Sequence, residues 1–221
     1  HQILGNNLVA NVTNFTVWFA LTFWVYLETH SVFATGMIAG IYLVFTAAFG
    51  IWFGSLVDHN PKKLVMLGSS VVSALFYVLA LAVLLLAPAE SFTNPYNAFL
   101  WIFVFLVMLG VIAGNIRSIA LPTLVTVLIP EDRRDKANGL VGMVGGIGFL
   151  TTSVISGFLV AFGGMLAVML LALVFTGLAF VHLSFVQIDE GRSAPDPEAP
   201  AESKRVDLKG TIKVIAGVPG L

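Results

Sequence analysis

Charged residues divide this chain into long apolar runs. Five runs contain no Asp, Glu, Lys or Arg apart from Arg117: residues 2–27, 29–57, 64–89, 91–130 and 137–188. A helix needs about 20 apolar residues to cross the hydrocarbon core of a bilayer. Each of the first four runs therefore predicts one transmembrane helix. The last run is long enough for two helices, and Gly163-Gly164 is the expected turn between them.

The pattern thus predicts an all-α membrane protein, with a six-helix bundle over residues 1–188. The expected helices cover about 6–27, 33–57, 64–87, 99–128, 138–161 and 165–187. The amino-acid composition changes after this bundle. Residues 189–205 are rich in Pro, Ala, Glu and Ser, which is typical of a flexible linker, and we place it in the cytoplasm.

Positive charges gather in alternate loops of this predicted bundle. Lys and Arg number two in residues 58–63, three in residues 130–136 and five after residue 188, whereas the other loops have none. Cytoplasmic loops carry the excess of Lys and Arg in membrane proteins. The sequence therefore predicts a multi-pass protein of the cell (plasma or inner) membrane with both chain ends in the cytoplasm.

The composition agrees with a bilayer as the solvent and excludes several function classes. The chain is 58% hydrophobic and 10% charged, with a mean hydropathy of +0.96. A net charge of −1 argues against a nucleic-acid partner. Cysteine is absent, and no catalytic, cofactor-binding or metal-ligand spacing occurs. We expect a protein that is not an enzyme and that has the lipid bilayer as its main partner.

The loop between the second and third predicted helices carries the most specific motif. It reads Gly54-Ser-Leu-Val-Asp58-His-Asn-Pro-Lys62-Lys63. Glycine permits close helix contact, Asp58 can accept hydrogen bonds from a neighbouring helix N-terminus, and lysines anchor at lipid headgroups. This segment resembles the signature of the major facilitator superfamily in the same loop, which implies a conformational-gating role for Gly54, Asp58, Lys62 and Lys63. The alternative is a generic cationic hairpin loop.

A second resemblance covers the following helices. Arg117-Ser-Ile-Ala-Leu-Pro122, Ile129-Pro-Glu and Ala137-Asn138 occur in the order typical of the macrolide-efflux and siderophore-export branch of that superfamily. Residues 206–221 resemble that branch's lead into a seventh helix. The resemblance implies that this chain is the N-terminal half of a twelve-helix fold, whose partner is a C-terminal six-helix half. An offset of 103 residues pairs similar positions, which favours a 3+3 inverted repeat.

The function implied by this resemblance is secondary active transport by alternating access. The expected substrate is a small amphipathic molecule that is moved outward, and the resemblance also suggests exchange for protons, as in an antiporter. Two alternatives remain open: an uptake transporter of the same fold, and a membrane scaffold or sensor without transport activity.

Arg117 is the one charge well inside a predicted helix. A buried cation is costly in a membrane unless it is paired or hydrated. It could line a cavity or a proton path. It could equally tie its helix to carbonyl groups or to a carboxylate near Asp58.

Asn7, Asn11, Asn14 and Trp18 follow a helical spacing and predict one polar face on the first helix. This face could form the wall of a substrate cavity, or it could hydrogen-bond to other helices. The pairs Gly36/Gly40, Gly50/Gly54 and Gly110/Gly114 predict faces of close helix packing. His182 is expected to be a packed or interfacial side chain.

Overall fold

The computed structural model describes residues 2–187, without the side chains of residues 126–128, 131 and 144. These residues form helices and no strands, in the order α1 (Gln2–Thr29), α2 (Val32–Asp58), α3 (Lys62–Leu86), η1 (Ala89–Phe92), α4 (Ala98–Gly114), α5 (Ile116–Leu128), η2 (Glu131–Arg133) and α6 (Arg134–Phe185). The all-α prediction is therefore confirmed for the described part of the chain. The expected linker and the lead-in to a seventh helix lie outside it.

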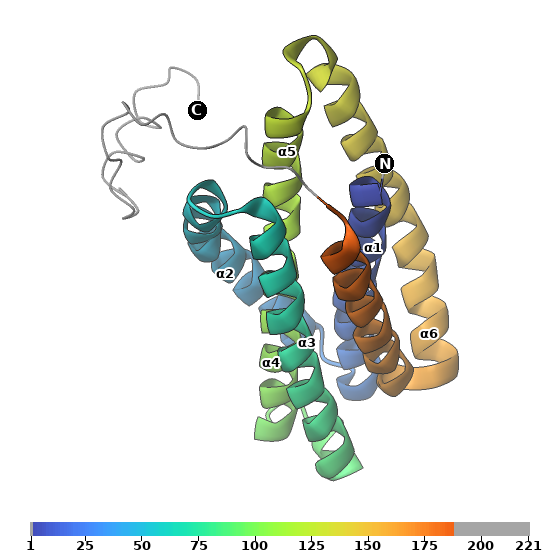
Figure 1. Cartoon of the computed structure of the whole chain (residues 1–221). Coiled ribbons are helices and arrows are strands. Elements are labelled where there is room, and N and C mark those ends of the chain that lie inside the picture. Colours follow the sequence, from blue (N-terminus) through green and yellow to red (C-terminus); the bar gives the residue numbers. More distant parts are fainter. Residues whose placement is uncertain (1, 188–221) are drawn as a thin grey trace, which may run out of the picture.

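Polar residues in the short connections begin the helices. The Ser31 hydroxyl accepts a hydrogen bond from the backbone N–H of Ala34 at 3.1 Å, at the start of α2. The Asn97 side chain accepts one from the N–H of Phe99 at 2.9 Å, at the start of α4. Such caps satisfy N–H groups that have no partner inside the helix. The short connections then reverse the direction of the chain from one helix to the next (Figure 1).

Two breaks shape the later helices. A turn at Asn115 separates α4 from α5, which together form one apolar stretch from Ala98 to Val125. Helix α6 contains a sharp kink at Gly164, whose φ of 60° and ψ of −171° are not helical. Glycine adopts a positive φ without steric cost. The kink divides α6 into two arms, residues 134–163 and 165–185, which fold back on each other in Figure 1.

Five helical stretches of the described residues are long and apolar enough to cross a membrane. The fourth predicted helix corresponds to α4 and α5 together. The fifth and sixth predicted helices both fall within α6, and the kink lies in the glycine pair where the sequence predicts a turn. The number of six membrane crossings stays a prediction, as does the inverted repeat.

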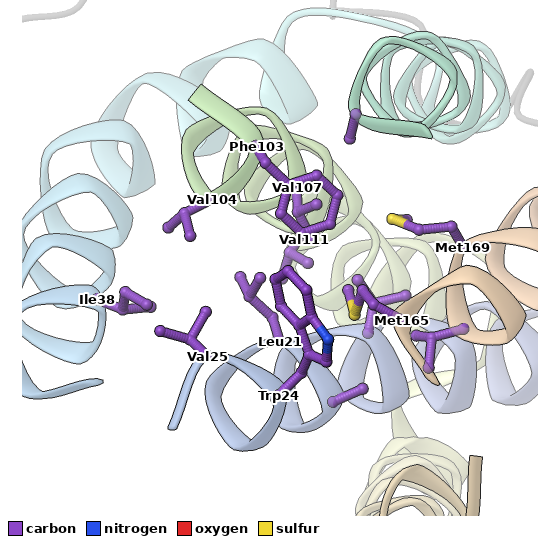
Figure 2. Packing of buried hydrophobic residues seen from close by; sticks show 14 of the residues in the cluster. Leu21, Trp24, Val25, Ile38, Phe103, Val104, Val107, Val111, Met165 and Met169 are labelled. Atoms are coloured by element: carbon purple, nitrogen blue, oxygen red, sulfur yellow. The ribbon is translucent and has the colours of Figure 1, made fainter. Parts of the chain in front are cut away.

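The main apolar core lies between α1, α4 and the second arm of α6 (Figure 2). Trp24 of α1 packs edge-on against Phe103 of α4, with ring centroids 5.3 Å apart. Met165 and Met169 of α6 fill the same core. Many large apolar side chains point outward from the bundle, among them Leu43 and Val44 of α2. Lipid tails accept such side chains, so apolar residues on the outside of the bundle cost little free energy in a membrane.

The basic loops lie at one end of this bundle. The α2–α3 connection with Lys62 and Lys63 and the α5–α6 connection with Arg133 and Arg134 both occur on the side of the N-terminus, opposite the Gly164 kink (Figure 1). We call this side the basic end. Its assignment to the cytoplasm remains a prediction from the charge pattern.

A candidate polar site inside the bundle

Arg117 lies in the first turn of α5 and is buried, with 3% of its surface exposed. Its Nη1 donates a hydrogen bond to Asn6 Oδ1 of α1 at 2.8 Å, and its Nη2 donates one to Ser70 Oγ of α3. Asn6 in turn donates to the backbone oxygen of Ala179 in α6 at 2.7 Å. We call Asn6, Ser70, Arg117 and Ala179 the arginine cluster. The guanidinium ties α5 to α1 and α3, and the Asn6 amide extends the link to α6.

The arginine cluster lies toward the basic end of the bundle. Asn6 is in the second turn of α1, and Ser70 lies about 12 Å along α3 from Lys62. His182 lies beside the cluster, with its Nδ1 3.2 Å from Asn6 Nδ2, although the histidine itself is exposed at the surface of the bundle. This arrangement resembles a clamp, but the acceptors are an amide and a hydroxyl rather than backbone carbonyls or a carboxylate.

A second polar group lies deeper in the bundle. Asn14 of α1 donates hydrogen bonds to the backbone oxygen of Val111 at 3.1 Å and to Asn115 Oδ1 at 2.9 Å. Tyr77 of α3 donates to Asn14 Oδ1 at 3.3 Å, and Asn115 donates to the Tyr42 hydroxyl of α2 at 2.8 Å. We call Asn14, Tyr42, Tyr77 and Asn115 the asparagine cluster. It links α1, α2, α3 and the α4–α5 turn in one chain of hydrogen bonds.

A small polar cavity separates the two clusters. The volume that the centre of a water-sized sphere can occupy in this cavity is about 20 Å³. The lining includes Arg117, Asn14 and Tyr77 together with five serine and threonine residues, namely Thr13, Ser69, Ser70, Ser73 and Thr176. A volume of this size holds one water molecule or one small ion.

Two glycines of α4 allow this dense packing. A Cβ atom at Gly110 would lie 2.5 Å from the Tyr77 ring, and a Cβ atom at Gly114 would lie 2.6 Å from Asn14 Oδ1. The predicted close packing at Gly110/Gly114 is therefore confirmed. For Gly36/Gly40 and Gly50/Gly54 of α2 the prediction is wrong within the described chain, because no atom of another helix lies within 4 Å of the Cβ position at any of the four.

The structure divides the predicted polar face of α1. Asn14 is buried and hydrogen-bonded between helices, whereas Trp18 stacks on Tyr42 of α2 with ring centroids 3.9 Å apart. Asn7 is buried, and its Oδ1 has no hydrogen-bond donor among the described residues. Asn11 is half-buried. The face therefore contains one fully bonded amide and one amide oxygen that still needs a donor.

Sequence reasoning missed several members of these clusters. Asn6 precedes Asn7 and lies outside the helical spacing of Asn7, Asn11 and Asn14. Tyr42, Tyr77 and Asn115 are isolated polar residues in apolar runs. The available signal for α3 was the spacing of Ser70, Ser73 and Tyr77, which puts them on one helical face. Such a face in an otherwise apolar helix must meet protein or water.

The loop motif lies apart from both clusters, at the basic end of the bundle. Asp58 ends α2 and is exposed, and its backbone oxygen accepts a hydrogen bond from Lys62 Nζ at 3.3 Å. Lys63 Nζ donates to the backbone oxygen of Ser184 at 3.0 Å, at the end of α6. The lysine thus ties the loop to a helix C-terminus, where a cation is favourable. Close helix contact at Gly54 does not occur among the described residues.

Comparison with known proteins gives the family. No curated protein matches the chain significantly. The sequence profile of the Major Facilitator Superfamily matches residues 3–221. This match covers nearly the whole chain and agrees with the loop motif and with the all-helical, membrane-spanning architecture. The chain therefore belongs to the major facilitator superfamily of membrane transporters.

Proposed function

We propose that this chain forms one half of a secondary active transporter that exports a small amphipathic molecule by alternating access. The observation that carries the proposal is the buried Asn7 Oδ1 of α1, for which the described residues offer no donor. A buried amide oxygen without a partner costs about 1–3 kcal/mol. This oxygen is covered by the surrounding helices of the same bundle, so water or substrate can supply the donor only when these helices move, as they would in alternating access.

The packing of α2 supports a second bundle. Nine glycines on α2 and on the first arm of α6 have open space at their Cβ positions: Gly36, Gly40, Gly50, Gly54, Gly139, Gly142, Gly145, Gly146 and Gly157. Small residues let helices approach closely in a membrane. These two surfaces are our candidates for packing against a C-terminal six-helix half, and rocking of the two halves would alternate the access.

Outward transport rests on the resemblance of the Arg117–Asn138 segment to exporters. Proton exchange would need a titratable acid inside the membrane. The described helices place their carboxylates at helix ends, so this acid would belong to the other half. The Lys and Arg residues in alternate loops support a location in the cell membrane with both chain ends in the cytoplasm.

The test is flux through the complete protein in inverted membrane vesicles. We expect vesicles that contain the protein to accumulate ethidium, a small amphipathic probe, when a proton gradient is imposed. Vesicles that contain only residues 1–221 should not. Absence of flux for ethidium and a panel of similar dyes, with the protein folded and inserted, would favour the scaffold. Movement only in the opposite direction would favour uptake.

Single cysteines test the cavity wall separately, since the chain has no cysteine of its own. Asn7→Cys and Asn11→Cys in the complete protein should react with a small permeant thiol reagent and be protected by a transported dye. Asn14→Cys lies between helices, and Val44→Cys on α2 faces lipid, where thiolate does not form. Equal labelling at all four positions contradicts the cavity.

A further inference from the structure

The guanidinium of Arg117 is a buried cation, and the described residues offer it no negative partner. Among the described residues its contacts are neutral, namely Asn6 Oδ1 and Ser70 Oγ. Every Asp and Glu of residues 2–187 lies at a helix end or in a connection, so none reaches the middle of the bundle. Burial of an uncompensated charge costs several kcal/mol in a protein interior. The fold therefore leaves a positive charge that a small anion would neutralise.

The cavity beside Arg117 has the donors that such an anion needs. A guanidinium carries N–H groups on Nε and on both Nη atoms, and only one on each Nη is used in the arginine cluster. Thr176 also lines the cavity, and its hydroxyl hydrogen is not donated to any described group. The hydroxyls of Thr13 and Ser73 donate to Val9 O and Gly110 O but can rotate toward the cavity.

We propose that this cavity binds one small monovalent anion, such as chloride, held by Arg117 and the surrounding hydroxyl groups. The cavity is too small for an organic substrate, since only about 20 Å³ is open to the centre of a water-sized sphere. A cation is excluded by the adjacent guanidinium. Water fits the volume but leaves the charge uncompensated. The site lies within one bundle, so the inference is independent of the transported molecule and of the direction of transport.

Thermal unfolding of the complete protein in detergent tests the site without a transport assay. Chloride, bromide and gluconate are compared at equal ionic strength, because gluconate is too large for the cavity. Replacing gluconate by about 100 mM chloride should raise the Tm by roughly 3 °C, and bromide should act similarly. Ser73→Thr keeps the hydroxyl but adds a methyl group to the cavity, so it should abolish the shift. Thr176→Val, which removes a donor, should reduce it.

The matched control is Ser118→Ala, which removes an exposed hydroxyl next to Arg117 in the chain. This variant should retain the full chloride effect. Equal Tm values in all three salts for the unmodified protein would overturn the proposal and assign the cavity to water. A chloride shift that persists unchanged in both Ser73→Thr and Thr176→Val would also overturn it, because the anion would then bind elsewhere. If Ser73→Thr does not fold, Thr176→Val decides alone.

Discussion

Helix α2 and the α4–α5 pair are both long and apolar, yet they occupy opposite environments. Of the most apolar 18-residue stretch of each, 11% is buried for α2 and 56% for α4–α5. Lipid accepts a leucine as readily as a protein core does. In a membrane, hydrophobicity therefore does not decide which helices lie inside the bundle and which face lipid. The buried pair differs in carrying Arg117 and Asn115, whose polar groups need partners and so favour the interior. Both helices contain glycine pairs, but only Gly110/Gly114 lies close to another helix.

The comparison also separates two kinds of contact. Helix α2 meets the bundle through four buried apolar side chains and through Tyr42, which stacks on Trp18 and accepts a hydrogen bond from Asn115. The α4–α5 pair is held by several hydrogen bonds and by tight glycine packing. A helix with few internal contacts is suited to movement or to packing against a second bundle.

Loss of a partner for Arg117 should have the largest effect. Asn6→Ala removes the acceptor of one guanidinium N–H and the bond to Ala179, so we expect the free energy of unfolding to fall by about 2–3 kcal/mol. Asn11→Ala on the same helix is the control, because Asn11 makes no such hydrogen bonds with the described residues and its loss should change stability little. Thermal unfolding in detergent measures both. Equal losses would mean that Arg117 does not hold α5 in place.

A methyl group on α4 should act more strongly than one on α2. Gly110→Ala places a Cβ atom against the Tyr77 ring, and we expect a loss of about 1–3 kcal/mol. Gly40→Ala meets open space and should leave stability unchanged or raise it by up to about 1 kcal/mol, since alanine favours the helix. If transport by the complete protein is lost in a stable Gly40→Ala variant, the second bundle packs there. Similar destabilisation in both variants would remove the distinction between the two helices.

The link between α2 and the bundle should be weaker. Tyr42→Phe keeps the stack on Trp18 but removes the acceptor for Asn115, so we expect a loss of about 1 kcal/mol. The control Tyr26→Phe changes an exposed tyrosine of α1 and should have almost no effect. An unchanged unfolding midpoint for Tyr42→Phe would show that stacking alone holds α2.

The smallest effect on stability is expected at the exposed end of α2. Asp58→Asn should change the free energy of unfolding by less than about 0.5 kcal/mol, because the side chain faces water. The helix N-terminus proposed as the partner of Asp58 would meet it only in some conformations of the transport cycle. Loss of the charge should therefore slow the cycle and lower the rate of ethidium flux. Wild-type flux would contradict the gating role, and loss of folded protein would indicate a structural one.

The sequence by itself determined that the chain is helical, where its apolar runs begin and end, and which family it belongs to. These properties are local, because a charge is costly in hydrocarbon at any position and the bilayer thickness sets the length of each run. The same reasoning located the glycine pair at which α6 kinks. The basic loops predicted an orientation in the same way, from counts of Lys and Arg.

Only the tertiary structure decided which polar groups meet. Four asparagines lie within the first four turns of α1, and spacing alone does not show that Asn6 binds Arg117 while Asn7 Oδ1 lacks a donor. Likewise, Gly50/Gly54 and Gly110/Gly114 have the same spacing, but only the second pair faces another helix closely. Hydrogen bonds and close contacts depend on the rotation of each helix about its axis, which apolar runs do not specify because lipid and protein accept the same side chains.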